Sequence, residues 1–237
     1  MKIKWFKTID STNNRIARDK EDLPDRTVYM TDFQTAGKGQ RGNHWESAAA
    51  ENLLFSILLK PTDILAGNQF IISQAVTLGI VDYVRSKGIE AKVKWPNDIY
   101  VGDRKICGIL IENAVNGDRI VSSVVGIGFN LNQLSFSDWI PNPVSLSMLT
   151  DVHYDLKEEL RSLLHFIFAE YDRRSAATEE RYIASLYRLG VQCSYIDAAT
   201  DQPFEGTIIG VDRTARVIID TEEGEKAFAF KELQYII

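Results

Sequence analysis

The sequence has few cysteines, no long hydrophobic run and no excess of basic residues, and each shortage excludes a class of protein. Its two cysteines, Cys107 and Cys193, lie far apart and match no CxxC or zinc-ligand spacing, so we expect ordinary thiols in a reducing compartment. No apolar run approaches the roughly 18 residues that span a bilayer. The N-terminus, MKIKWFKTID, also lacks the apolar region of a signal peptide. These features predict a cytoplasmic protein with no membrane partner.

The charge balance excludes another class of protein. Lys and Arg number 27 against 33 Asp and Glu, which gives a formal net charge of -6. A general nucleic-acid binder needs a basic face that displaces counterions, so we expect no nucleic-acid partner. Apolar residues, in contrast, are plentiful, because 45% of the 237 residues are hydrophobic. This is enough for one substantial globular domain and a small one.

The most informative stretch is residues 31–47, TDFQTAGKGQRGNHWES. Its glycines let the backbone come close to a ligand, and Lys38 and Arg41 supply fixed positive charge between them. This combination suits a phosphate group. A plain surface hairpin rich in turn-forming residues has the same composition, so the loop alone leaves both interpretations open.

The spacing of Gly37, Gly39 and Gly42 fits the G-x-G-x-x-G pattern of dinucleotide-binding proteins, but the surrounding sequence does not. That fold needs a strand, the glycines and then a helix, whereas here TVYMTDF is a predicted strand before the loop and NLLFSILL is another after it. The kinase sequences V-A-I-K, H-R-D and D-F-G are missing, and so is GxxxxGK[ST]. The glycine loop therefore connects two strands and belongs to another kind of site.

The chain before this loop predicts a strand and a short helix. Residues 2–9 alternate as in a strand, and Ser11 to Asn14 directly precede RIARDK. Ser11 is the predicted N-cap, whose hydroxyl would accept a hydrogen bond from the first helical turn. The same hydroxyls and amides could instead face a ligand, together with the free N–H groups of the helix start.

The chain after the loop predicts a buried helix and then a hairpin. The apolar pattern of residues 69–87 predicts the helix, and Gly88 ends it. In residues 91–113, AKVKWPNDIYVGDRKICGILIEN, Pro96 halts a first strand and the Gly102–Asp103 turn sends the chain back. RIVSSVVGIGFNLN follows as another strand and ends on small residues that allow close backbone approach.

Asn97, Asp98 and Lys105 lie on or beside the turns of this predicted hairpin. Taken singly, they suit an Asn-Asp turn and a solvated lysine. Taken with the basic loop, they are the groups needed to bring ATP and an anion together, and Asp98 is a carboxylate able to hold Mg²⁺. Trp45 could stack on a purine or pack in the core.

The last part of the chain predicts two helices and then a change of period. A connector over 131–154 leads to an amphipathic helix, in which Asp155 and Glu158 have capping-box spacing, and a second helix, EERYIASLYRL, ends before Gly190. From Val191 onward the hydrophobic period is two, which suggests a small SH3-like barrel. The predicted strands are QCSYID, FEGTIIGV, ARVIID, EKAFAF and LQYII.

The chain resembles a biotin-protein ligase, the enzyme that attaches biotin to carrier domains of carboxylases. The three motifs of that family appear in order, as STN at 11–13, GKGQRGNHW at 37–45 and KWPNDIYVGDRKICGILIE at 94–112. The resemblance continues through GIGFN at 126–130 into the C-terminal β region, so it covers nearly the whole chain.

The resemblance implies an α+β fold with a mixed central sheet flanked by helices, as in class II synthetase-like catalytic domains, and a C-terminal SH3-like β-barrel. On this basis we expect a catalytic domain over 1–188 and a small β domain over 189–237. Some family members carry a DNA-binding winged helix before the STN motif. Because only ten residues precede Ser11 here, we expect the form that lacks this domain and has no repressor function.

The resemblance also implies a function, partners and site residues. The expected enzyme activates biotin with ATP and Mg²⁺ as biotinyl-5'-AMP and transfers it to a lysine of a biotin carboxyl carrier domain, as a monomer or a homodimer. The implied catalytic residues are Lys105, Arg41 and Asp98, with Asp98 as the candidate Mg²⁺ ligand. The implied biotin-binding residues are Ser11, Thr12, Asn13, Gln34, Gly37, Lys38, Gly39, Gln40, Lys105 and Gly108. The implied ATP- or adenylate-binding residues are Lys38, Gln40, Arg41, Asn43, Trp45, Asn97 and Asn130.

Two positions depart from the family pattern. Gln40 and Asn43 stand where many members carry arginine, so we expect phosphate contact there by hydrogen bonding and a looser hold on the adenylate. The loop is also expected to act as a lid that keeps water from the adenylate.

Two other functions remain to be distinguished. A lipoate or octanoate ligase or transferase shares the catalytic scaffold, but the glycine-triplet and His-Asp signatures of those relatives are not seen. A non-enzymatic peptide-binding module would require loss of the site lysine, whereas Lys105 is present.

Overall fold

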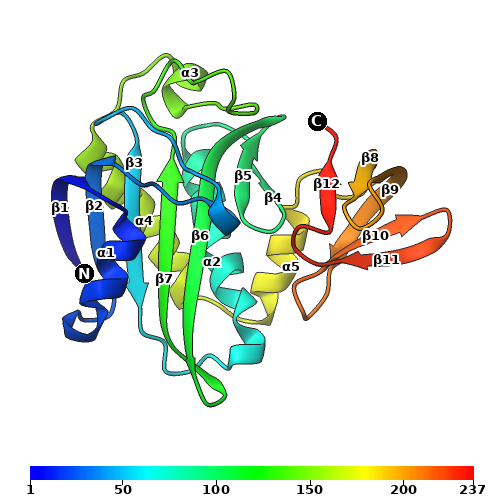
Figure 1. Cartoon of the computed structure of the whole chain (residues 1–237), viewed down its shortest axis with the longest axis horizontal. Helices are drawn as coiled ribbons and strands as arrows, with labels where there is room; N and C mark the ends of the chain where they lie inside the picture. Colours follow the sequence, from blue (N-terminus) through cyan, green and yellow to red (C-terminus); the bar gives the residue numbers. More distant parts are fainter.

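The computed structural model contains two β-sheets, a large one packed against helices and a small one formed by the end of the chain (Figure 1). It describes residues 1–40 and 42–237 in full, and the side chain of Arg41 lies outside this description. The large sheet has seven strands in the order β1-β2-β3-β7-β6-β5-β4, and the small sheet has five in the order β11-β10-β9-β8-β12. The predicted α+β architecture with a mixed central sheet is therefore confirmed.

The large sheet is mixed because its first two strands are parallel, whereas all its other neighbouring strands are antiparallel. Strand β3, which lies between β2 and β7, is buried along its whole length, as its apolar sequence LLFSILL requires. The strands are β1 (Lys2–Ile9), β2 (Thr27–Gln34), β3 (Leu53–Leu59), β4 (Lys92–Lys94), β5 (Asp98–Val101), β6 (Arg104–Asn116) and β7 (Arg119–Phe129).

Two long helices, α2 and α4, pack against each other and cover one face of this sheet. The α-helices are α1 (Thr12–Asp19), α2 (Phe70–Ser86), α3 (Leu146–Thr150), α4 (Leu156–Asp172) and α5 (Ala176–Ala184). Short 3₁₀ turns occur at η1 (Lys20–Asp22), η2 (Gln40–Gly42) and η3 (Ala66–Asn68).

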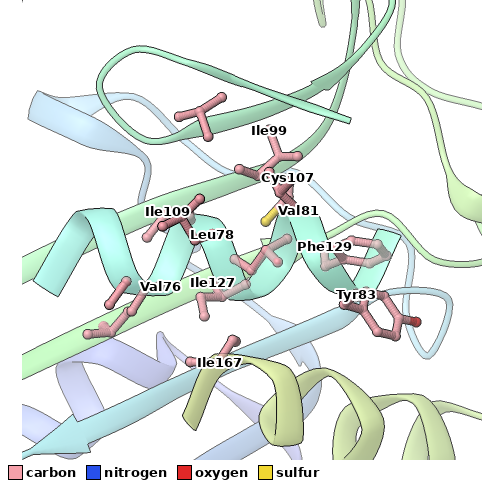
Figure 2. Packing of buried hydrophobic residues seen from close by; sticks show 14 of the residues in the cluster. Val76, Leu78, Val81, Tyr83, Ile99, Cys107, Ile109, Ile127, Phe129 and Ile167 are labelled. Atoms are coloured by element: carbon pink, nitrogen blue, oxygen red, sulfur yellow. The ribbon is translucent and has the colours of Figure 1, made fainter. Parts of the chain in front are cut away.

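The main core lies between the sheet and these helices. Figure 2 shows Val81 and Tyr83 of α2 against Ile127 and Phe129 of β7, and the rings of Tyr83 and Phe129 are 5.5 Å apart. Because strand side chains alternate between faces, residues 125, 127 and 129 face the helices and residues 124, 126 and 128 face the other way.

The opposite face of the sheet is covered only in part. Helix α1 lies over it, where Ile16 packs with Tyr29, Leu58 and Val124 in a smaller cluster. Farther along β7 the residues on this face are glycines, which bring no side chain to fill the space. The alternation of a single strand thus produces a packed core on one side and an open surface on the other.

The small sheet is antiparallel and lies against the end of the large one (Figure 1). Trp95 joins the two, because its indole donates a hydrogen bond to the Ala215 carbonyl at 3.0 Å and its ring lies 6.4 Å from that of Phe230. The strands are β8 (Gln192–Asp197), β9 (Gln202–Val211), β10 (Val217–Thr221), β11 (Gly224–Phe228) and β12 (Leu233–Tyr235). Closure of this sheet into a barrel and a domain boundary at 188/189 both stay predictions.

The structure corrects three local predictions. The second C-terminal helix ends at Ala184, before the predicted end, because the next residues bond to β4: Val93 donates to the Ser185 carbonyl at 2.8 Å, and Tyr187 donates to the Val93 carbonyl at 2.8 Å. Helix α3 lies within the segment predicted to be only a connector. Strand β9 begins at Gln202, two residues before the start of the predicted strand FEGTIIGV.

The caps of the two predicted helices differ. Asp155 is the N-cap of α4, and its carboxylate accepts from the Lys157 and Glu158 amides at 2.9 Å each. Ser11 occupies the N-cap position of α1, but in the described part of the chain its side chain makes no capping hydrogen bond, so the predicted capping role is wrong. Within residues 1–40 and 42–237, no helix is both long and apolar enough to cross a membrane.

We predict that Gly79→Ala destabilises the fold. A Cβ at this position of α2 would lie 2.6 Å from the Ile167 Cα of α4, so the two helices would have to separate. The expected loss is about 1–3 kcal/mol of unfolding free energy, as for other overpacked cores, despite the better helix propensity of alanine. Chemical denaturation measures it. Gly67→Ala is the control, because a Cβ there meets no atom of the described residues within 4 Å; equal stability of the two variants would contradict the packing.

Candidate active site

A cavity of about 930 Å³ opens on the partly covered face of the large sheet. Segments far apart in the sequence meet around it: the start of α1, the glycine loop, the β4–β6 region, the end of β7, the segment after β7 and the end of the small sheet. Of the predicted site residues, the cavity is lined by Ser11, Thr12, Asn13, Gln34, Lys38, Gly39, Gln40, Asn43, Trp45, Asn97, Asp98, Lys105, Gly108 and Asn130. Gly37 does not line it, and the prediction for Arg41 falls outside the described residues.

One end of the cavity is a buried polar wall at the start of α1. Ser11, Thr12 and Asn13 are only 2–3% exposed. The Thr12 amide donates to Oε1 of Gln34 at 2.8 Å, which ties α1 to the end of β2. A buried serine of β3, Ser56, lies 2.6 Å from Oγ1 of Thr12 and 2.5 Å from Oδ1 of Asn13. This wall presents hydroxyl and amide groups without a net charge.

Glycines form the floor. Gly108 of β6 pairs with Gly128 of β7, and both face the cavity. The indole of Trp45 lies directly on them, because a Cβ on Gly128 would be 2.3 Å from its Cε2 and a Cβ on Gly108 would be 2.6 Å from its Cζ3. The Nε1 atom of Trp45 is buried and has no hydrogen-bond partner among the described residues. Trp45 is therefore part of the site and not of the main core.

The glycine loop folds back on itself over this floor. The Gly39 amide donates to the Asn43 carbonyl at 2.7 Å, and the Trp45 amide donates to the Gly37 carbonyl at 3.1 Å. Gln40 connects the loop to the next motif, since its Nε2 donates to Oδ1 of Asn97 at 2.7 Å. The side chain of Asn97 also donates to the Ile109 carbonyl, so both ends of its amide are engaged within the protein.

Opposite charges meet at the other end of the cavity. Nζ of Lys105 lies 2.7 Å from Oδ2 of Asp98, and the two side chains are 28% and 27% exposed. The same ammonium lies 5.6 Å from the centre of a Trp45 ring. At this degree of exposure the pair is only moderately stabilising, so an arriving anion can share the lysine. The cavity thus has an uncharged hydrogen-bonding end and an end that carries charged side chains.

A second lysine near this end was missed in the sequence, where it appeared as an ordinary alternating strand residue. Lys94 of β4 lines the cavity, with Nζ 4.5 Å from the centre of the Tyr235 ring and 5.2 Å from that of Tyr100. Burial lowers the pKa of Lys94, although the charge of Asp98 acts in the opposite direction. Its strand position contained no signal of this role, because Tyr235 comes from the other sheet.

Two further parts of the rim were also missed. The segment after β7, predicted only as a proline-containing connector, brings aromatic side chains to the cavity, among them Trp139, which is 62% exposed. Asn130 lies at the start of this segment and donates to the Val144 carbonyl at 3.1 Å, so it holds the segment in place. The end of the small sheet adds Phe230, Lys231, Leu233, Gln234 and Tyr235.

The side chains of the site supply little for a resident metal ion. Among the described residues, no group of three or more His, Cys, Asp or Glu side chains is placed to hold one. Asp98 offers one carboxylate, and it already pairs with Lys105. Mg²⁺ is commonly held by one or two carboxylates together with the phosphates of a substrate. These residues therefore fit a magnesium ion that arrives on a nucleotide.

Comparisons with known proteins agree on one family. A family model described as the biotin/lipoate A/B protein ligase family matches residues 5–130. The chain is 26% identical over 228 residues to the bifunctional ligase/repressor BirA of Bacillus spizizenii, covering 93% of this chain and 70% of that protein. It is 34% identical over 133 residues to biotin–protein ligase 1 of Arabidopsis thaliana, covering 54% of this chain and 36% of that protein.

The structure is similar to that of a biotin protein ligase from Aquifex aeolicus in complex with biotin and ATP. The TM-score is 0.81 at 26% sequence identity, and the match covers 98% of this chain and 97% of the other. The similarity includes the small C-terminal sheet as well as the large one.

We predict that Gly128→Ala displaces the Trp45 indole, because the new methyl group would overlap it. Tryptophan emission should then shift to longer wavelength as the buried Nε1 reaches water, and the shift should be absent when Trp45→Phe is also present. Gly210→Ala is the control, since a Cβ there meets nothing within 4 Å. Identical emission spectra of Gly128→Ala and the wild type would show that the indole does not rest on Gly128.

Proposed function

The chain belongs to the biotin/lipoate A/B protein ligase family, and we propose that it is an ATP-dependent biotin–protein ligase. It activates biotin as biotinyl-5'-AMP and then transfers the biotinyl group to a lysine of a biotin carboxyl carrier domain. The observation that supports this most directly is that one cavity has the uncharged polar wall of Thr12 and Gln34 at one end and Lys105 at the other. Biotin has the same polarity, with a ureido ring at one end and a carboxylate at the other.

In this proposal the ureido ring lies at the polar wall and the biotin carboxylate lies toward Lys105. Attack of a carboxylate oxygen on the α-phosphorus of ATP brings two anions together, so the reaction needs positive charge fixed in place before it starts. Lys105 supplies that charge, and Asp98 holds its ammonium at 2.7 Å. Asp98 would help to hold a Mg²⁺ ion that arrives with ATP, and this ion would supply further positive charge at the phosphates. Pyrophosphate leaves, and biotinyl-5'-AMP remains bound.

The second step needs no nucleophile from this chain. The neutral amine of the acceptor lysine attacks the biotinyl carbonyl, an amide bond forms, and AMP leaves as the good leaving group of a mixed anhydride. The protein must instead keep water away, because water would hydrolyse the same anhydride. The glycine loop suits this task, since Gln40 ties it to Asn97 across the cavity and Trp45 covers the floor.

The polar wall also favours biotin over other acids used in this family. Lipoate and octanoate end in a dithiolane ring and an alkyl chain, which cannot satisfy buried hydroxyl and amide groups. Leaving such groups without partners costs about 1–3 kcal/mol each. Ser56, Gln34 and Glu112 already satisfy part of this wall, so the cost would fall on the groups that still face the cavity, a lone pair of Thr12 and the side-chain N–H of Gln34. A cyclic urea, in contrast, offers both N–H donors and a carbonyl acceptor.

We further propose a setting for this activity. The two cysteines are unpaired, which suits a reducing compartment such as the cytoplasm. Strand β1 lies at the edge of the large sheet and could pair with a second copy, so both a monomer and a homodimer are compatible with the fold. The acceptor is the carrier domain of a biotin-dependent carboxylase, and MgATP is the co-substrate.

ATP–pyrophosphate exchange tests this function. We expect exchange with biotin and little or none with lipoate or octanoate. Lys105→Ala should abolish the biotin-dependent signal, because the biotin carboxylate and the α-phosphate lose the cation between them. Lys226→Ala is the matched control, since that lysine pairs with Glu223 on the surface and does not line the cavity. Exchange with lipoate instead of biotin would give the protein a different substrate, and full activity of Lys105→Ala would remove this lysine from the mechanism.

A further inference from the structure

Ser56 is the one polar residue in the sequence of β3, LLFSILL, and its side chain is completely buried. A hydroxyl inside an apolar strand is costly unless it is hydrogen-bonded. Its Oγ lies 2.5 Å from Oδ1 of Asn13 and 2.6 Å from Oγ1 of Thr12, so it contacts two groups at once. Ser56 does not line the cavity itself, but both of its partners do.

The direction of the Asn13 amide is fixed by its other contacts. Its Nδ2 donates to Oε2 of Glu112 at 2.8 Å and lies 3.5 Å from the Leu110 carbonyl. A carboxylate and a carbonyl can only accept, so the NH₂ group must face them and Oδ1 must face Ser56. Gly126 leaves the room for this arrangement, because a Cβ there would lie 2.2 Å from Oδ1 of Asn13.

The proton positions then follow by counting. Ser56 has one hydroxyl proton, and Oδ1 of Asn13 can only accept, so the proton of Ser56 goes to Asn13. The 2.6 Å contact with Thr12 also needs a proton, which Thr12 supplies to Ser56 in preference to its more distant acceptor, Oε1 of Gln34 at 3.2 Å. The backbone N–H of Thr12 is used as well, since it donates to Oε1 of Gln34 at 2.8 Å.

These proton positions determine which hydrogen-bond donors and acceptors the polar wall presents to a ligand. Thr12 donates its hydroxyl proton within the protein, so toward the cavity its oxygen presents a lone pair and can only accept a hydrogen bond. Gln34 has its oxygen on the Thr12 amide, so its free Nε2 is a donor. An acceptor beside a donor matches the N–H and C=O of a cyclic urea.

We propose that Ser56 is a positioning residue that makes Thr12 a hydrogen-bond acceptor and so selects a ring N–H over a ring oxygen at that place in the ligand. This inference rests on the proposed function, because it takes biotin as the ligand. Ser56 acts through Thr12 and touches no substrate. A ligand of the same shape with oxygen in place of the N–H would bring two lone pairs together. It should bind roughly 10- to 100-fold more weakly than biotin.

The test compares biotin with two analogues on matched variants by titration calorimetry. The ligands are biotin and its ring-carbamate analogues, in which either ureido N–H is replaced by oxygen, and the measured quantity is the ratio of their dissociation constants. In Ser56→Ala the proton of Thr12 is no longer held by Ser56, and the ring oxygen competes for it only with Oε1 of Gln34 at 3.2 Å. For the analogue with oxygen facing Thr12, the ratio should therefore fall at least about tenfold.

Asn13→Ala tests the same chain of hydrogen bonds from its other end. Without Oδ1, the proton of Ser56 can go to Thr12, which frees the proton of Thr12 for the cavity, so the ratio should fall here too. Ser123→Ala is the control, because Ser123 is an equally buried serine of the neighbouring strand β7 and its Oγ has no partner among the described residues. Its ratio should equal that of the wild type.

The outcomes separate this inference from the function on which it rests. If Ser56→Ala and Asn13→Ala weaken both ligands equally and leave the ratio unchanged, Ser56 only fills space and the inference is overturned. Should Ser56→Ala not fold, as judged by circular dichroism, Asn13→Ala decides alone. If the wild-type protein does not bind biotin at all, the proposed function itself is wrong.

Discussion

The site depends on a part of the large sheet where one face carries only glycines and therefore no side chains. Gly108 on β6 and Gly126 and Gly128 on β7 share one face of paired antiparallel strands. Because side chains alternate along a strand, the same segment of β7 places Val125, Ile127 and Phe129 in the core behind it. One short sequence, VGIGF, therefore anchors the sheet to its helices and keeps the opposite face open for a ligand.

Everything else in the site is arranged around these glycines. Asn13 occupies the space that Gly126 leaves, and Trp45 occupies the space above Gly108 and Gly128. The two ends of the cavity then differ in chemistry: a neutral hydrogen-bonding wall lies at the start of α1, and a Lys105–Asp98 pair lies on the β5–β6 hairpin. In the proposed function, this separation lets one cavity bind an uncharged ring and still hold two anions close enough to react.

The sequence predicts most of this fold because its patterns are local. The alternation of residues 2–9, the apolar run of β3 and the glycine after α2 each depend on neighbours in the chain, and each matches the structure. Nearly all of the site residues that the motifs predicted line one cavity, although their individual roles stay predictions. What the sequence could not show depends on contacts between distant segments. Lys94 lies in the site because Tyr235 of the other sheet packs over it, and the last turn of the predicted α5 is replaced by pairing with Val93.

The central claim is that this single cavity makes and holds biotinyl-5'-AMP. A single-turnover experiment tests it most directly, with the protein in excess over ATP labelled at the α-phosphate, in the presence of biotin and without an acceptor. The account predicts that the label becomes protein-bound biotinyl-5'-AMP and is released as AMP only when a biotin carboxyl carrier domain is added. Cleavage of ATP to ADP, or formation of AMP at the same rate without biotin, would contradict it.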